Sequence, residues 1–127
     1  HPEVCISTDT ILMGMGRPSY LFHGCYPKFI GRYVRDKKLL PLETAIRKAT
    51  GLPAEHFGLK DRGKIAVGAH ADIVVFDDAT IASGASFEEP DRPPIGIEYV
   101  FINGKMVVDH GKINTGKRAG KVLRGNN

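Results

Sequence analysis

The sequence predicts an α+β chain in which helices come first and short strands follow. Apolar residues recur at helical spacing between Lys28 and Phe57, as in helices that bury one face. After Gly58 the pattern changes to short runs rich in β-branched and aromatic residues, which are typical of strands. Two of these runs flank Asn103-Gly104, the strongest short-range signal of a β-hairpin.

The N-terminal part is expected to contain a strand and a long loop. Val4-Cys5-Ile6 is a short apolar run that ends in Ser7-Thr8-Asp9, as expected of a buried strand that runs into a polar loop. Glycines and prolines are frequent from Thr10 to Pro27, so we expect an ordered loop there. Long loops in compact domains are commonly functional.

Two helices and one further turn are predicted next. The first covers Lys28 to Leu39 and carries cations near its C-terminal end, where they complement the helix dipole. Pro41 opens the second helix, because proline is tolerated in a first turn, and Gly51 is expected to end it. Residues 53–57 form one more turn before Gly58.

The remaining residues are expected to form a β-layer and a basic tail. The strand candidates are Lys64–Val67, Ala71–Phe76, Ile97–Ile102 and Lys105–Val108. Prolines between Thr80 and Pro94 limit regular structure in the connection. We therefore divide the chain into residues 1–58, with the first strand and the helices, and residues 59–127, with the β-layer and the tail.

The first strand decides between two architectures. A lone buried parallel strand cannot satisfy its ladder hydrogen bonds. A self-contained α+β fold leaves this strand unpaired, whereas the last strand, loop and helices of a β/α (TIM-type) barrel, joined to a separate β-layer, explain it. The chain also begins with His1-Pro2 and no initiator Met, so we expect a piece of a longer protein.

Composition excludes several classes of protein. The net charge of +4 comes from 18 Lys and Arg against 14 Asp and Glu, and its excess lies in a tail without aromatics, which favours solvation over nucleic-acid binding. No apolar run approaches the roughly 18 residues of a membrane helix. The two cysteines do not make a disulfide framework. We expect a cytoplasmic protein that binds neither nucleic acid nor membrane.

Asp9 is the strongest catalytic candidate in the sequence. It follows a predicted buried strand, and catalytic carboxylates of β/α barrels occupy the C-terminal ends of strands, where the loops converge. Such a carboxylate can take a proton from a metal-bound water and pass it to a leaving amine. The alternative is that Asp9 caps a turn, as Asx residues commonly do.

Several motifs occur along nearly the whole chain in an order that resembles the end of the D-aminoacylase family (N-acyl-D-amino-acid deacylases). This family belongs to the metal-dependent amidohydrolases. The motifs are Ile6–Asp9, Gly24–Arg35, Leu39–Ala54, Gly63–Asp77, Gly96–Gly104 and Gly116–Arg124. The glycine-bracketed segment Gly63–Asp77, with its Ala-Asp step before an apolar run, is similar to the C-terminal β-segment of amidohydrolases in general.

The resemblance implies an amidohydrolase barrel with a β-sandwich built from both chain ends. Asp9 would follow the eighth barrel strand, activate a zinc-bound water and protonate the departing amine. The zinc ligands would come from earlier strands, so this chain is expected to bind no metal itself and to be inactive without the remainder of the enzyme. The implied substrate is a small N-acylated D-amino acid.

The sequence departs from the family pattern at the substrate carboxylate. D-aminoacylases usually carry a His-Pro-Arg triplet in the loop, and its arginine binds this carboxylate; here the place holds Ser19-Tyr20-Leu21. Arg17 or Lys28 is a substitute cation, or both are ordinary surface cations. His23 is a further candidate in the loop, with simple solvation as its alternative.

Other chemistry in the sequence is weaker. His70 and Asp72 have a ligand-like spacing on a strand, but a third ligand is missing, so a structural role is expected.

Two further functions remain open. One is a self-contained, non-catalytic α+β binding module. The other is a cyclic amidase like dihydroorotase or hydantoinase, which shares the Ala-Asp β-segment but not the Tyr26-Pro27-Lys28 loop.

Overall fold

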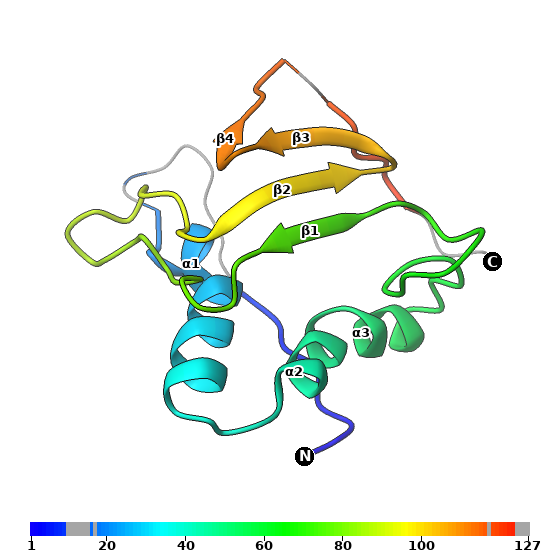
Figure 1. The fold of residues 1–127 in the computed structure, drawn as a ribbon, viewed down its shortest axis with the longest axis horizontal. Coiled ribbons are helices and arrows are strands. Elements are labelled where there is room, and N and C mark those ends of the chain that lie inside the picture. Colours follow the sequence, from blue (N-terminus) through cyan, green and yellow to red (C-terminus); the bar gives the residue numbers. More distant parts are fainter. Residues whose placement is uncertain (10–15, 17, 117, 124–127) are drawn as a thin grey trace.

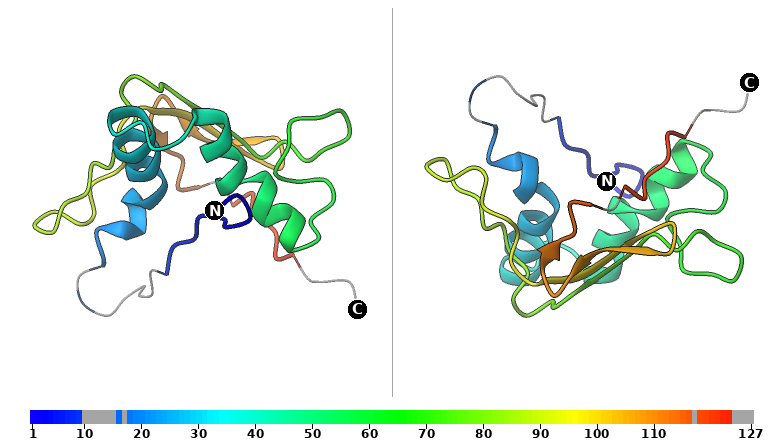
Figure 2. Two further views of the ribbon diagram at one scale, coloured as in Figure 1. Left: turned by 90° about the horizontal axis from the view of Figure 1, so that it is seen from below. Right: turned by 90° about the horizontal axis from the view of Figure 1, so that it is seen from above.

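The computed structural model describes residues 1–9, 16, 18–116 and 118–123. The helical elements are α1 (Leu21–Lys28), the π-helix η1 (Phe29–Asp36), α2 (Leu42–Ala49) and α3 (Gly51–His56). The strands are β1 (Ile73–Phe76), β2 (Ile97–Ile102), β3 (Lys105–Asp109) and β4 (Lys112–Ile113). Figure 1 shows the sheet as one layer with the helices below it, and Figure 2 shows the same layers from below and above. The predicted succession of helices followed by short strands is confirmed for the elements from α1 onward.

The core is small and comes mainly from the helices, with one residue after β1 and one near the C-terminal end. Its members are apolar side chains with less than a tenth of their surface exposed: Ile30, Val34, Ala45, Leu52, Ala54, Ile81 and Ala119. Among the described residues, none of the buried side chains is polar or charged. The helices and the segment after β1 therefore share one apolar interior, since burial of apolar surface is the main favourable contribution to folding.

Residues 10–15 and 17 of the predicted loop from Thr10 to Pro27 lie outside the described residues. The prediction was wrong for the last part of this loop, because α1 begins at Leu21 and contains Pro27. Gly24 was interpreted as a loop residue, but it allows close packing instead. A Cβ atom at Gly24 would lie 2.1 Å from the Oγ of Ser83. The predicted helix over Lys28 to Leu39 is confirmed as η1, which continues α1 without a break.

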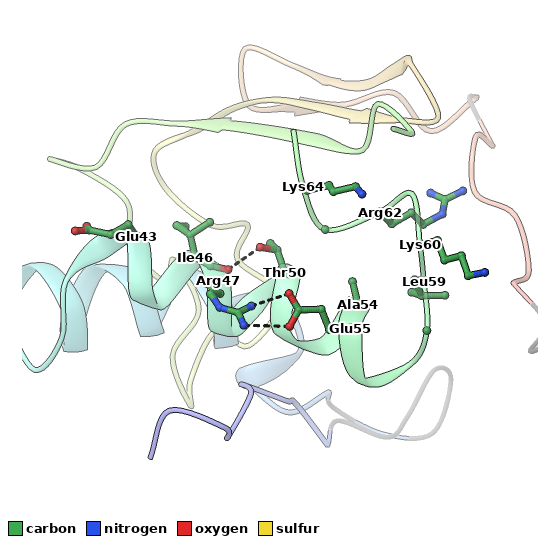
Figure 3. A pocket seen from close by; sticks show the side chains of 13 residues that line it. Glu43, Ile46, Arg47, Thr50, Ala54, Glu55, Leu59, Lys60, Arg62 and Lys64 are labelled. Atoms are coloured by element: carbon green, nitrogen blue, oxygen red, sulfur yellow. Dashed lines mark hydrogen bonds and ion pairs between the residues drawn. The ribbon is translucent and has the colours of Figure 1, made fainter. Parts of the chain in front are cut away.

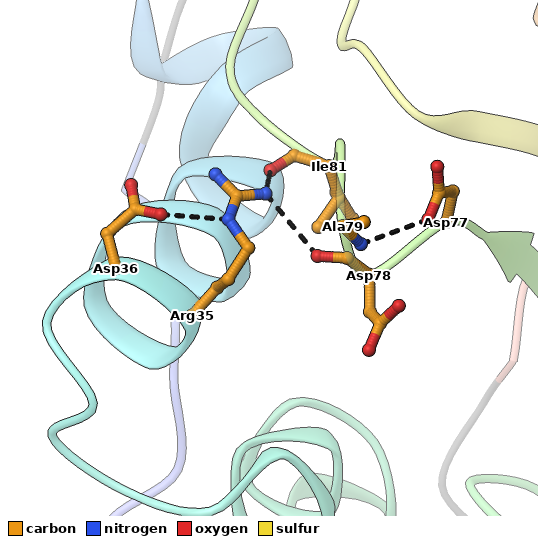
Figure 4. Close-up of polar contacts among 6 residues, drawn as sticks. All are labelled: Arg35, Asp36, Asp77, Asp78, Ala79 and Ile81. Carbon is orange, nitrogen blue, oxygen red and sulfur yellow. Dashed lines mark hydrogen bonds and ion pairs between the residues drawn. The ribbon is translucent and has the colours of Figure 1, made fainter.

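One face of this helix binds the segment that follows β1. Arg35 donates hydrogen bonds from Nη1 to the carbonyl oxygens of Ile81, at 2.7 Å, and Asp78, at 3.4 Å, and from Nε to Asp36 at 2.8 Å (Figure 4). A Cβ atom at Gly31 would lie only 2.2 Å from the carbonyl oxygen of Ile81. The hydrogen bonds of Arg35 and the absence of a side chain at Gly31 together hold the segment against the helix.

The second predicted helix is confirmed with shifted ends. Pro41 is extended and precedes α2, so its fixed φ prepares the helix without costing an internal hydrogen bond. The prediction that Gly51 ends this helix was wrong. The break lies at Thr50, which has a non-helical conformation, and Gly51 starts α3. Gly58 follows α3 with φ of +66°, a conformation that favours glycine.

The four strands form an antiparallel sheet in sequence order, β1-β2-β3-β4. The predicted hairpin is confirmed, because Asn103 and Gly104 connect β2 to β3 with φ of +49° and +75°, as in a type I′ turn. Sequence analysis missed β4, which has only two residues. His110 and Gly111, also at positive φ, turn the chain into it.

Two predicted strands are absent from the described structure. Val4-Cys5-Ile6 is not paired as a strand with any described strand; the Ile6 N–H donates to the carbonyl of Lys48 at 3.0 Å instead. In Lys64–Val67, the side chains of Ile65 and Val67 are exposed. Apolar alternation alone does not make a strand when nothing packs on its apolar face.

A polar network joins the segment before β1 to the β2–β3 turn. The carboxylate of Asp72 accepts a hydrogen bond from the Asn103 N–H at 2.7 Å and one from Arg62, whose other terminal nitrogen donates to the Asn103 side chain at 2.9 Å. The Asn103 amide donates to the carbonyl of Ala119 at 2.7 Å. The structural role predicted for Asp72 is confirmed.

Asp72 gives the fold a predictable response to acid. The hydrogen bond from the Asn103 backbone and the Arg62 guanidinium lower the pKa of Asp72 below its ordinary value of 3.8. The stabilisation is therefore complete above the unfolded-state pKa and is lost as the pH falls through the lower folded-state pKa. We expect Asp72→Asn to reduce the free energy of unfolding at neutral pH, and the difference from wild type to shrink below about pH 4.

Denaturant unfolding between pH 7 and pH 3 measures this effect. Asp61→Asn, at an exposed residue, is the matched control and should show no such pH-dependent difference. A stability difference between Asp72→Asn and wild type that is the same at pH 7 and pH 3 would show that the charge of Asp72 contributes nothing.

Candidate functional site

Asp9 lies exposed at the end of the N-terminal segment of residues 1–9. Two contacts fix the middle of this segment: the backbone bond from Ile6 to Lys48, and a hydrogen bond of 3.4 Å from the Tyr26 hydroxyl to the Ile6 carbonyl. Partial burial raises the pKa of Tyr26, so its hydroxyl stays protonated and donates at neutral pH. The carboxylate of Asp9 is thus presented to solvent three residues beyond an anchored position.

Lys48 of α2 holds the beginning of the same segment. Its ammonium group donates to the carbonyl oxygens of His1, Pro2 and Val4 at 2.5, 3.2 and 2.7 Å. An ammonium group has three donors and no acceptor, so these three carbonyls use its full capacity. Sequence analysis missed both Lys48 and Tyr26 as residues that position Asp9, because contacts across 20 residues for Tyr26 and more than 40 for Lys48 leave no mark on local spacing.

The other predicted site residues lie apart from this segment where they are described. Arg17 falls outside the described residues. His23 is exposed on α1 and packs edge-to-face with Phe22 at 4.9 Å between ring centroids. The Lys28 ammonium lies 4.9 Å from the centre of the Tyr20 ring. His23 and Lys28 therefore contact residues of α1 or the residue before it, and not Asp9.

The direction of Lys28 follows from helix geometry. Tyr26 contacts the Asp9 segment, and residues two positions apart point roughly 200° apart around a helix. Lys28 accordingly lines a hollow on the other side of α1, which also contains Arg32 and the segment of residues 82–87.

Within the part of the chain that the structure describes, no group of three or more His, Cys, Asp or Glu side chains is placed to hold a metal ion. Cys5 and Cys25 are free thiols, and both contribute to the raised pKa of Tyr26. No described helix is long and apolar enough to cross a membrane.

A separate hollow of about 720 Å³ lies between α2, α3 and the following loop (Figure 3). Arg47 spans from α2 to Glu55 of α3 with two hydrogen bonds of 3.0 Å, which lower the pKa of Glu55. Lys60 and Lys64 come from the loop. Of the predicted catalytic and substrate-binding residues that the structure describes, none lines this hollow. The Arg47–Glu55 pair links two consecutive helices rather than forming a reactive pair.

Comparison with known proteins identifies the family of this chain. The sequence profile of the Amidohydrolase family matches residues 2–108. The chain belongs to the amidohydrolase family. It is 47% identical over 107 residues to a D-aminoacylase of Alcaligenes xylosoxydans xylosoxydans, covering 84% of this chain and 22% of that protein. It is 41% identical to an N-acyl-D-glutamate deacylase of the same organism, covering 96% of this chain and 25% of the relative.

Solved amidohydrolase structures agree with this relationship. The crystal structure of N-acyl-D-glutamate deacylase from Bordetella bronchiseptica, complexed with zinc and a phosphonate inhibitor, matches with a TM-score of 0.79 and 41% identity, over 85% of this chain and 22% of that one. A dihydroorotase of Lactobacillus acidophilus is more distant, at 33% identity over 63% of the chain. The chain thus spans about a quarter of the length of the curated deacylases that it matches.

Proposed function

We propose that the chain is the C-terminal, Asp9-bearing part of a hydrolase that cleaves the amide bond of N-acyl-D-amino acids. The observation that carries this proposal is the 47% identity with D-aminoacylase over 84% of the chain. The predicted division follows from the same relationship: residues 1–58 would complete an amidohydrolase barrel, and residues 59–127 would belong to its β-sandwich. A cytoplasmic location stays a prediction.

Asp9 is the residue to which we assign proton transfer. In amide hydrolysis the attacking water loses a proton, and the departing amine gains one, so a single carboxylate can accept the first and deliver the second. The exposed position of Asp9 beyond the anchors at Lys48 and Tyr26 supports this role.

We place the zinc ligands in the remainder of the enzyme chain, which is then the partner that completes the site. This assignment is supported by a related deacylase that was crystallised with zinc and by the resemblance of the chain to the C-terminal part of that family. The 127-residue chain is accordingly expected to have no turnover by itself.

The cation that binds the substrate carboxylate is proposed to be Arg17 or Lys28, with His23 as a neighbour in the same part of the chain. An arginine binds a carboxylate through two parallel hydrogen bonds, whereas a lysine offers a point charge. The described position of Lys28, on the opposite side of α1 from the Asp9 segment, favours Arg17.

The alternative enzyme is a dihydroorotase-like cyclic amidase, which the dihydroorotase match supports at lower identity. A substrate panel separates the two. We expect the full-length protein to release free amino acid from N-acyl-D-amino acids, and to leave dihydroorotate and hydantoin intact, because a ring-opening enzyme must accommodate a cyclic amide. Ring opening without deacylation would reverse this assignment. Turnover of neither class would favour the non-catalytic binding module.

A further inference from the structure

A second hollow lies on the side of the helix that faces away from the Asp9 segment. It has a volume of about 440 Å³, and its walls are α1 and η1 on one side and residues 82–87 on the other. The walls are fixed by the same contacts that join the two halves of the fold, namely the Gly24 and Gly31 close approaches and the bond from Arg35 to Ile81. The shape of the hollow is therefore fixed by the contacts between the helices and the segment that follows β1.

Cations dominate the helical wall. Lys28, Arg32 and Arg35 all line the hollow, and they lie three or four residues apart on one helical face. Like charges at this spacing repel each other and destabilise a helix. Asp36 is the one carboxylate among the described lining residues, and it accepts its hydrogen bond from Arg35.

The three cations differ in how their donors are used. Arg35 is committed to Asp36 and to two backbone carbonyls, and Lys28 lies over the Tyr20 ring. Arg32 is exposed, and no hydrogen bond or ion pair joins its guanidinium to any described residue. Its planar guanidinium keeps its donors for an oxyanion, which it can bind through two hydrogen bonds.

The opposite wall adds neutral groups. Ser86 lies across from the cations, with its hydroxyl donating to Glu88 at 3.0 Å, and the Phe87 side chain is 80% exposed. The Glu88 carboxylate, which accepts this hydrogen bond, brings a negative charge to the loop, so an anion is favoured at the helical wall. The hollow thus offers positive charge on one side and an apolar ring on the other.

We propose that this hollow binds a small oxyanion, a phosphate or a carboxylate, between Arg32 and Lys28. Bound there, the anion offsets the repulsion between the two cations. In this assignment Arg17 and not Lys28 binds the substrate carboxylate, and the anion has no part in the proposed hydrolysis, because the hollow lies on the opposite side of α1 from the Asp9 segment.

Isothermal titration of the full-length protein with inorganic phosphate, and separately with acetate, tests this proposal at constant ionic strength. We expect saturable binding of at least one anion, and the tighter of the two identifies the ligand class. Arg32→Gln should weaken binding about 5- to 10-fold, as expected for one exposed charge-assisted contact. Lys105→Gln, which removes an exposed positive charge from β3, should leave binding unchanged.

Two results would overturn the proposal. The first is the absence of saturable binding, or equal binding by wild type and Arg32→Gln. The second is a rise in KM for the amide substrate in Arg32→Gln, which would make the hollow part of the substrate site. Because binding is read without turnover, a failed assignment of the enzyme activity leaves this result intact.

Discussion

Replacing Asp9 by asparagine is expected to reduce kcat of the full-length enzyme by about 10²- to 10⁴-fold, the usual contribution of a general acid–base group. Asparagine keeps the size of the side chain but cannot accept the proton of the attacking water at neutral pH. Since the proposed zinc ligands lie outside this chain, the zinc content of Asp9→Asn should equal that of wild type. Initial rates with an N-acyl-D-amino acid and metal analysis of the same samples measure both quantities.

The control for this variant is Asp91→Asn, which removes an equal charge from an exposed loop residue. It should keep the kcat of wild type. Normal turnover in Asp9→Asn would refute the assignment of Asp9. A loss of zinc together with activity would instead show that Asp9 contributes to the metal site.

The substitution Gly31→Ala is expected to lower the free energy of unfolding by about 1–3 kcal/mol, the range for overpacking a tight contact. The new Cβ would lie 2.2 Å from the Ile81 carbonyl oxygen and 3.2 Å from its carbon, so backbone must move. The better helix propensity of alanine would by itself add about 1 kcal/mol of stability. The sign of the measured change in the free energy of unfolding therefore shows whether overpacking or helix propensity dominates.

Chemical denaturation of full-length wild type and Gly31→Ala gives this sign. Gly120→Ala is the matched control, because a Cβ atom there meets no atom within 4 Å. If Gly31→Ala were as stable as wild type or more stable, the segment at Ile81 would not pack on the helix as described.

Local patterns in the sequence predicted the regular elements that carry strong signals. The Asn103-Gly104 turn and the Ile73–Phe76 run gave β1, β2 and β3, because turn chemistry and β-branching act locally. Gly24 and Pro27 misled the prediction, since they were interpreted as loop residues, whereas tertiary packing keeps them in α1. The Lys64–Val67 run caused the opposite error, because it was predicted to be a strand and is an exposed segment without regular structure.

The candidate site was less accessible to prediction. Asp9 was identified from its place after an apolar run and from the family resemblance, and its assignment stays a prediction. The role of Lys48 in holding the N-terminal segment could not be predicted, because its partners at His1, Pro2 and Val4 are close to it only in the folded chain. The cationic hollow was missed for the same reason, as its second wall comes from residues 82–87.

The most direct test of the proposed function is the rate at which the full-length protein releases free amino acid from the two enantiomers of one N-acyl amino acid. We predict steady turnover of the D enantiomer and a rate for the L enantiomer close to that of a blank without enzyme. Equal rates for both enantiomers, or hydrolysis of the L form alone, would contradict the assignment to N-acyl-D-amino acids.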